Sequence, residues 1–213
     1  MADGVMNIAS SITLALALAS LSACSPSPSK TAEPPLAGAS IGGPFSLVDQ
    51  DGGTFTDRDL LGKYAIVYFG YTYCPDVCPV DLQKLMRGLA AFQKTDPAAA
   101  ARVQPVFISV DPARDTPAVL KTFVASFGPT LIGLTGTDAQ IAAVTKSYAA
   151  SYRKVEGSSP DAYLMAHSQI AYLMGPKGEP IALLPLDDPS TEVDEGSADA
   201  VAATLRQWVR PAA

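Results

Sequence analysis

The chain has 213 residues, of which 48% are hydrophobic, and this is enough for one domain with a sizeable core and some extensions. Its formal net charge is −6 and its 15 lysines and arginines are scattered, so it lacks the basic stripe with which proteins bind nucleic acid. With three cysteines and one histidine, neither a dense disulfide framework nor a site of several imidazoles can form within one chain.

The N-terminal segment resembles an export signal. Residues 8–23 are strongly apolar and almost free of charge, but they fall short of the roughly 20 residues that a membrane-spanning helix needs. The stretch LSAC that ends at Cys24 is similar to the bacterial lipoprotein signal, which is cleaved before a cysteine that then carries lipid. We therefore expect a signal peptide over residues 1–23, lipid on Cys24, and a body anchored on the periplasmic side of a bacterial membrane.

Two other interpretations of this segment remain open. They are a plain secretory signal and a retained N-terminal anchor, because no lysine or arginine before Lys30 supplies the positive start that such signals usually have. The next residues are rich in proline, serine and alanine and have no apolar period, which is typical of a flexible tether. We expect the lipid anchor and tether to cover residues 24–40 and the folded domain to cover residues 41–210.

Within the expected domain, strand and helix signals alternate along the chain. The expected strands cover residues 64–72, 103–110 and 130–136, each followed by an expected helix, over residues 79–94, 118–128 and 138–150. A β-hairpin over residues 41–56 precedes them, and an edge strand over 151–156, two strands within 167–186 and a helix over 198–209 follow. This order predicts an α/β, thioredoxin-like fold with a central mixed sheet flanked by helices and an N-terminal β-hairpin.

Cys74 and Cys78 stand where an expected strand meets an expected helix, in the stretch YFGYTYCPDVCP at residues 68–79. A spacing of four residues places both thiols on one helix face. The unpaired N–H groups and the dipole at a helix start favour the thiolate form. A Cα separation of about 6 Å, expected for such a helical pair, also permits a Cys74–Cys78 disulfide.

This cysteine pair has three interpretations: an incidental pair in the core, a thiol–disulfide oxidoreductase, and a metal site that takes a further ligand from elsewhere. The spacing favours the metal site, because redox pairs of the thioredoxin type have two residues between their cysteines and this chain has three. Asp76, between the two cysteines, fits the start of a helix better than a metal ligand.

His167 is the only histidine, and it stands where a thioredoxin usually has a proline that faces its cysteines. A lone histidine is more often a satisfied or exposed residue than a ligand, but this position favours a ligand. Two thiolates and one imidazole form a soft donor set that suits three-coordinate Cu(I), and Cu(II) when a carboxylate, water or partner group completes it. Zinc in a structural site would normally take a fourth protein ligand.

Four motifs in the body of the chain are similar to those of the Sco/SenC family of copper proteins. They are YFGYTYCPDVCP at 68–79, SVDPARDTP at 109–117, LTGT at 134–137 and HSQIAYLMGPKG at 167–178. The resemblance covers most of residues 41–210. It implies a thioredoxin fold, a membrane tether and copper binding through Cys74, Cys78 and His167.

The resemblance also implies a function. Members of the family deliver copper to the dinuclear copper site of cytochrome c oxidase subunit II, or reduce the cysteines of that site, and both roles use the same three side chains. We therefore expect a copper metallochaperone, with a thiol–disulfide reductase and a copper or redox sensor as alternatives. Other periplasmic copper chaperones and thioredoxin-like reductases are further expected partners.

Two residues depart from the family pattern. Tyr73 stands where many members have a histidine before the first cysteine, and Ala166 stands where the family usually has an acidic residue before the histidine ligand. A carboxylate beside the histidine orients the imidazole and adds negative charge, so its loss bears on Cu(II) affinity or on partner docking. Asp161 is a candidate substitute for it.

Overall fold

The computed structural model describes residues 32–157, 162–187 and 194–211. A compact unit runs from Glu33 to Ala213. The predicted signal peptide, the predicted lipidation residue Cys24 and the candidate carboxylate Asp161 lie outside the described residues. Within the described ranges, no helix combines the length and the apolar character that crossing a membrane requires.

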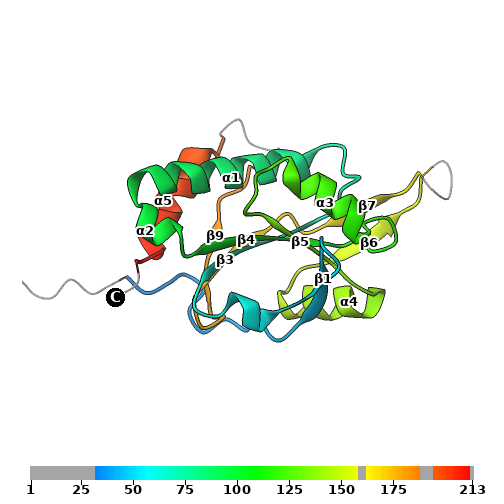
Figure 1. The fold of residues 1–213 in the computed structure, drawn as a ribbon, viewed down its shortest axis with the longest axis horizontal. Helices are drawn as coiled ribbons and strands as arrows, with labels where there is room; N and C mark the ends of the chain where they lie inside the picture. Colours follow the sequence, from blue (N-terminus) through cyan, green and yellow to red (C-terminus); the bar gives the residue numbers. More distant parts are fainter. Residues whose placement is uncertain (1–31, 158–161, 188–193, 212–213) are drawn as a thin grey trace, which may run out of the picture. The chain divides into compact units, whose positions relative to one another are not determined.

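The compact unit is built on a seven-stranded mixed sheet (Figure 1). Its strands in spatial order are β2 (Thr54–Thr56), β1 (Ser46–Asp49), β5 (Ile132–Thr135), β4 (Val103–Ser109), β3 (Tyr64–Gly70), β8 (Ala171–Met174) and β9 (Pro180–Leu184). The central strands β3, β4 and β5 run parallel, whereas the other neighbouring pairs are antiparallel. The predicted thioredoxin-like architecture and its N-terminal hairpin, β1–β2, are confirmed.

Helices cover both faces of this sheet (Figure 1). Three helices, α1 (Val77–Thr95), α3 (Pro117–Ala125) and α5 (Ala198–Trp208), lie on one face, and α4 (Asp138–Ser147) lies on the other. Two short helices, η1 (Asp57–Leu60) and α2 (Pro97–Ala100), were not predicted, because four residues are too few to show a helical period. The start of α3 agrees with its sequence signal: the Thr116 hydroxyl accepts the N–H of Val119 at 3.4 Å, and Pro117 occupies the first turn.

Strand β3 lies inside the sheet and leads to the cysteines. All seven of its residues are buried, as expected for a strand that helices cover on both faces. Successive side chains point to opposite faces: the Tyr68 hydroxyl donates to Asp81 of α1 at 2.8 Å, and the ring of Phe69 packs 5.5 Å from that of Tyr148, beside α4. β4 pairs with β3 as far as Gly70 and β8 pairs with it as far as Tyr68, so the loop that follows Gly70 starts from a strand that hydrogen bonds hold in the sheet.

A second sheet contains the two strands β6 (Tyr152–Val155) and β7 (Leu164–His167), and neither pairs with a described strand of the main sheet. The sequence places His167 at the start of the strand pair over 167–186, and this detail is wrong. His167 is the last residue of β7 and pairs with Tyr152 of β6. A four-residue strand such as LMAH has too little alternation to be recognised, and its pairing with β6 decides its conformation.

The folded unit begins earlier than the sequence predicts. Residues 33–40, assigned to the tether by composition, lie against the domain: Leu36 packs on the core, and its N–H donates to the carbonyl of Ile181 in β9 at 3.0 Å. Both contacts are made with a part of the chain far away in the sequence, so composition does not reveal them. The tether over residues 24–40 stays a prediction.

Candidate metal centre

The two cysteines lie where the loop after β3 enters α1. Cys78 is in the first turn of the helix and fully buried, whereas Cys74 precedes the helix and is half-buried. The N–H of Cys78 donates to Sγ of Cys74 at 3.5 Å, so the sulfur satisfies one of the unpaired donors at the helix start. Gly70 makes room for this arrangement, because a Cβ there would lie 3.1 Å from Sγ of Cys78 and 2.8 Å from the ring of Phe107.

His167 reaches the cysteines from the end of β7. Its Nε2 lies 3.2 Å from Sγ of Cys78, and its Nδ1 lies 3.0 Å from the carbonyl oxygen of Ser168. A carbonyl only accepts hydrogen bonds, so Nδ1 is a donor in this contact. Nε2 is therefore the ring nitrogen that faces the sulfurs, and it is the one that a metal ion between the three side chains would use.

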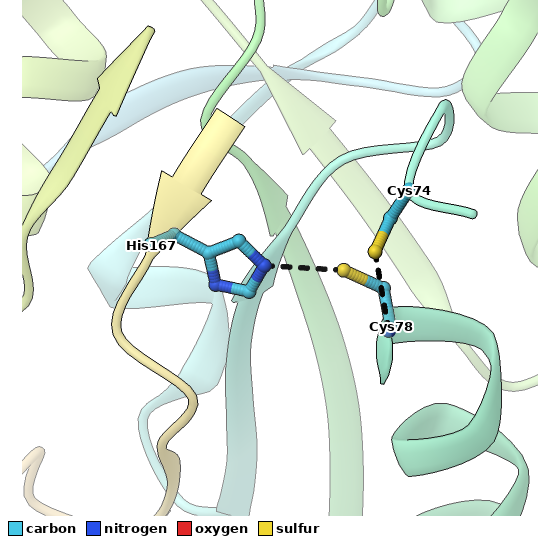
Figure 2. A group of neighbouring side chains, drawn as sticks. All are labelled: Cys74, Cys78 and His167. Carbon is cyan, nitrogen blue, oxygen red and sulfur yellow. Dashed lines mark hydrogen bonds between the residues drawn. The ribbon is translucent and has the colours of Figure 1, made fainter. Parts of the chain in front are cut away.

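The structure brings together the three predicted ligand residues. The sulfurs of Cys74 and Cys78 and a ring nitrogen of His167 all lie within 4.8 Å of one another, and Figure 2 shows the three side chains converging from the loop, α1 and β7. No carboxylate belongs to this group in the described part of the chain. Two sulfurs and one imidazole fit a soft ion of low coordination number, which is the preference of Cu(I).

The two thiols differ in their ionisation. Hydrogen bonding from Cys78 lowers the pKa of Cys74 from 9.0 to about 3, with further support from His167 and from backbone N–H groups. The same contact with Cys74, together with burial, raises the pKa of Cys78 above its ordinary value. At neutral pH the pair therefore holds one negative charge, located on the more accessible sulfur.

Aromatic and polar side chains pack around His167 and the start of α1. The rings of Tyr68 and Tyr71 meet the imidazole of His167 edge-on, with centroids 6.4 and 6.0 Å away. The carboxylate of Asp81 is buried and accepts hydrogen bonds from the Tyr68 hydroxyl at 2.8 Å and from Nε2 of Gln169 at 2.9 Å. Burial raises the pKa of Asp81. Both donors reach the same oxygen, Oδ2, and the bond from Gln169 connects α1 to the loop after His167.

A mostly apolar cavity of about 410 Å³ adjoins the exposed side of Cys74. Its lining includes Pro75, Val77, Val155, Leu164 and Met165, together with Cys74 and His167 themselves. The site is therefore open on one side, where a group from a second molecule can approach the Cys74 sulfur without a rearrangement of the core.

Tyr73 and Asp76 in the cysteine loop and Ala166 in β7 are three further residues singled out in the sequence. Tyr73 is 54% exposed, and its ring lies 4.7 Å from the guanidinium of Arg114. Ala166 pairs with Arg153 across the β6–β7 hairpin. Asp76 is exposed and occupies the N-cap position of α1 without a side-chain capping bond, so it is a helix-start residue, as predicted, but not a capping one.

Sequence reasoning missed most of the supporting residues. Asp81 carries a signal, because it is an acidic residue three positions after Cys78 on the apolar face of a helix. Arg114 and Gln169 lie within two of the quoted motifs, but the sequence assigns neither them nor Tyr163 a role, since their roles depend on contacts between segments that are far apart in the chain.

The fold and these three side chains define a class: thioredoxin-like proteins with a dithiol and an imidazole in place of a simple redox pair. The SCO1/SenC family profile matches residues 33–202. The chain belongs to the SCO1/SenC family.

Relatives and solved structures agree with this assignment. The mitochondrial SCO1 homolog 1 of Arabidopsis thaliana is 49% identical over 146 residues, which are 68% of this chain and 42% of that protein. SenC of Rhodobacter capsulatus is 48% identical over 141 residues, 66% of this chain and 62% of that protein. The structure of Bradyrhizobium japonicum ScoI with copper bound is 41% identical, has a TM-score of 0.68, and the match covers 79% of this chain and 99% of that one. The chain thus spans about half the length of the curated relatives named first.

Proposed function

We propose that this protein binds one copper ion through Cys74, Cys78 and His167. The observation that carries the proposal is the convergence of two sulfurs and a ring nitrogen within 4.8 Å of one another. The donor set is soft enough for Cu(I), and a water or a partner group entering beside Cys74 would complete the coordination of Cu(II). The copper-bound relative from Bradyrhizobium japonicum supports copper as the metal.

We further propose that the copper is cargo, delivered to the dinuclear copper site of cytochrome c oxidase subunit II. Family membership supports this target. Delivery would proceed by ligand exchange, in which incoming thiolates replace Cys74, Cys78 and His167 one at a time, so that no free ion is released. The open side of the site at Cys74 supports Cys74 as the first ligand to be replaced.

The proposed location is the periplasmic side of a bacterial membrane. It rests on the apolar stretch over residues 8–23 and on the LSAC sequence that ends at Cys24. A lipid on Cys24 would keep the domain close to a membrane-bound oxidase. Other periplasmic copper chaperones are the proposed donors of the ion.

A second candidate function is the reduction of the oxidase cysteines. The asymmetry of the two thiols favours it, because a thiolate on the accessible Cys74 and a buried Cys78 thiol resemble an attacking and a resolving cysteine. The Cys74 thiolate would attack a partner disulfide, releasing one partner thiolate and forming a mixed disulfide. Cys78, after losing its proton, would then attack the sulfur of Cys74 and release the second partner thiolate. These two steps leave a reduced partner with two thiols and an oxidised protein with a Cys74–Cys78 disulfide. A thioredoxin-like reductase would then supply the two electrons and two protons that return this disulfide to two thiols.

Copper titration of His167→Ala separates the two candidates. We expect the reduced wild-type protein to bind one Cu(I) in competition with a colorimetric chelator, and we expect the variant to bind it at least about tenfold more weakly, because one of three ligands is lost. The rate at which each protein reduces a model disulfide is measured in parallel. A metallochaperone loses affinity in the variant, whereas a pure reductase keeps its exchange rate.

The matched control is Ser168→Ala, which leaves the Ser168 carbonyl oxygen in place to accept from Nδ1 of His167. This control should keep the wild-type affinity for copper. If the reduced wild-type protein binds Cu(I) no more tightly than His167→Ala does, the metal-binding function is wrong.

A further inference from the structure

The turn DPARD, residues 111–115, lies between β4 and α3 and belongs to one of the sequence motifs that the metal centre leaves without a role. It contributes no ligand to the group of Cys74, Cys78 and His167. Two of its three charged side chains are buried, with Asp111 3% and Asp115 0% exposed. Buried charges are costly unless they are paired and bonded, so their partners indicate what the turn does.

One set of contacts holds the cysteine loop. The carboxylate of Asp115 accepts the N–H of Thr72 at 3.0 Å and the Thr72 hydroxyl at 2.6 Å, and the Ser109 hydroxyl donates to it from the end of β4. Thr72 is two residues before Cys74. The turn therefore fixes the backbone from which the first cysteine enters the site.

A second set of contacts holds the strand that carries His167. Nη1 of Arg114 donates to the carbonyl of Tyr163 at 3.0 Å, and the guanidinium lies 3.6 Å from the centroid of the Tyr163 ring. The Tyr163 hydroxyl donates to Asp111 at 2.8 Å, and Asp111 forms an ion pair with Nε of Arg114. Tyr163 is the residue directly before β7, the strand that ends at His167.

Arg114 connects the two sets. Besides Tyr163, its guanidinium faces the rings of Tyr73 at 4.7 Å and Tyr71 at 5.8 Å, which flank Thr72 in the cysteine loop. Its Nη2 is buried and has no hydrogen-bond partner in the part of the chain that the structure describes. A surface cation would keep its donors in water, whereas Arg114 leaves one donor buried and unsatisfied, so we expect a structural role for it.

The contacts of Arg114 and Asp111 with Tyr163 matter because β6 and β7 form a separate sheet. The β6–β7 hairpin has no described backbone pairing with the main sheet, so side-chain contacts and the short connection from His167 to β8 hold it against the cysteine loop. The contacts of Arg114 and Asp111 with Tyr163 lie at the entry to β7, on the side of the cysteine loop. We propose that Arg114, oriented by Asp111, is a positioning residue that holds His167 at bonding distance from the dithiol without touching the metal.

The proposal rests on the proposed copper function for its metal readout, and it also makes a prediction for the metal-free protein. Arg114→Gln removes the cation and the planar fork and leaves a shorter, neutral polar side chain. Arg114→Lys keeps the charge but loses the bidentate, stacked geometry, so it should not restore the wild-type behaviour. Tyr163→Phe keeps the ring and removes only the bond to Asp111, which provides a milder variant if Arg114→Gln folds poorly.

Arg102→Gln is the matched control. Arg102 also stacks on a tyrosine, 5.3 Å from the ring centroid of Tyr64, and also donates to backbone carbonyls, including that of Arg210 at 2.8 Å. These contacts join the start of β3 to the C-terminal segment and not to the metal centre. An effect that both arginine variants share therefore reflects a general loss of stability, whereas an effect of Arg114→Gln alone reflects a displaced His167.

Copper binding and metal-free hydrogen exchange are measured on the full chain. We expect Arg114→Gln to weaken copper binding by about ten- to a hundredfold and to reduce the imidazole-nitrogen coupling in the electron paramagnetic resonance spectrum of the Cu(II) form. Arg102→Gln should change neither. In the metal-free protein, the amides of residues 162–168 should exchange faster in Arg114→Gln while those of β3 stay protected.

A double-mutant cycle with His167→Ala decides whether Arg114 acts through the histidine. In the His167→Ala background, Arg114→Gln should have no further effect on copper affinity, because the imidazole that it positions is gone. Additive losses, or unchanged exchange over residues 162–168, would overturn the proposal. If the wild-type protein binds no copper, the proposed function fails, and the exchange data alone decide whether Arg114 holds the hairpin.

Discussion

At the scale of single residues, the site is asymmetric. Cys74 is half-buried, accepts an N–H at the start of α1 and faces a cavity, whereas Cys78 is fully buried behind Gly70 and touches His167. The environment therefore places the shared negative charge on the sulfur that a partner reaches first. Both proposed functions need this arrangement, since ligand exchange and disulfide attack each begin at an accessible thiolate.

Alkylation of Cys74 tests this asymmetry. In the reduced, metal-free Cys24→Ser protein, the rate of reaction with iodoacetamide should be nearly constant between about pH 5 and pH 8, because Cys74 is already a thiolate with a pKa of about 3. An ordinary thiol with a pKa of about 8.5 would lose reactivity about tenfold for each unit that the pH falls below this value. Mass spectrometry identifies the modified residue.

The control for the alkylation experiment is the additional substitution Cys74→Ser. It removes the hydrogen-bonding partner of Cys78 but leaves that thiol fully buried, so labelling should become slow across the whole pH range. A rate in the Cys24→Ser protein that climbs tenfold per pH unit would contradict a depressed pKa for Cys74.

At the scale of elements, α1 has two tasks: its first turn carries Cys78, and its middle packs on α5. Gly88 is the contact point, because a Cβ there would lie 2.5 Å from Val201 and 2.9 Å from the carbonyl oxygen of Ala198. The two helices approach closely only because this position has no side chain. The packing of α1 on α5 and the metal centre lie at different turns of the same helix.

Gly88→Ala should therefore destabilise the fold without changing the site. We expect the free energy of unfolding in urea to fall by about 1–3 kcal/mol, because the added methyl group forces α1 and α5 apart, an effect larger than the gain in helix propensity. Copper affinity of the folded protein should stay at the wild-type value. Ala90→Ser, on the exposed side of α1, is the control and should change stability by less than about 0.5 kcal/mol. A stabilised Gly88→Ala protein would contradict the close packing.

At the scale of the whole molecule, metal binding and redox state are linked through one pair of sulfurs. A Cys74–Cys78 disulfide would remove two of the three proposed ligands, so only the reduced protein would take up copper. A ligand that binds the folded state alone stabilises it by mass action. Copper should therefore act as a stabiliser whose effect depends on the oxidation state of the protein.

Thermal unfolding measures this linkage. With free Cu(I) at about a thousand times Kd, the reduced protein should gain about 4 kcal/mol of stability and a correspondingly higher Tm, whereas the oxidised protein should gain none. The measurement is differential scanning calorimetry under anaerobic conditions. An equal shift for both oxidation states would mean that copper binds elsewhere.

The anchor is tested on the whole chain in a bacterial host. Cys24→Ser removes the proposed lipid attachment and should move the protein from the membrane fraction to the soluble periplasmic fraction. Fractionation and immunodetection follow the protein, and Ser22→Ala serves as a control that keeps the cysteine. A variant that stays in the membrane would favour a retained anchor.

The sequence by itself determined the local parts of this protein. The apolar run of β3, the periodic helix α1 and the cysteine pair at their junction are each encoded within a few residues, where hydrophobic period and spacing decide the conformation. The same local patterns gave the order of strands and helices and hence the thioredoxin-like class. The three donor types could be named as well, because the chain has one histidine and one cysteine pair in its body.

Only the tertiary structure decided how these parts meet. His167 contacts Cys78 across 89 residues of chain, and Arg114 reaches Tyr163 across 49. Such contacts depend on the packing of a separate hairpin against the cysteine loop, and no local period encodes them. The same reason explains why β7, the buried Asp81 and the role of the DPARD turn went unpredicted, although the residues themselves were visible in the sequence.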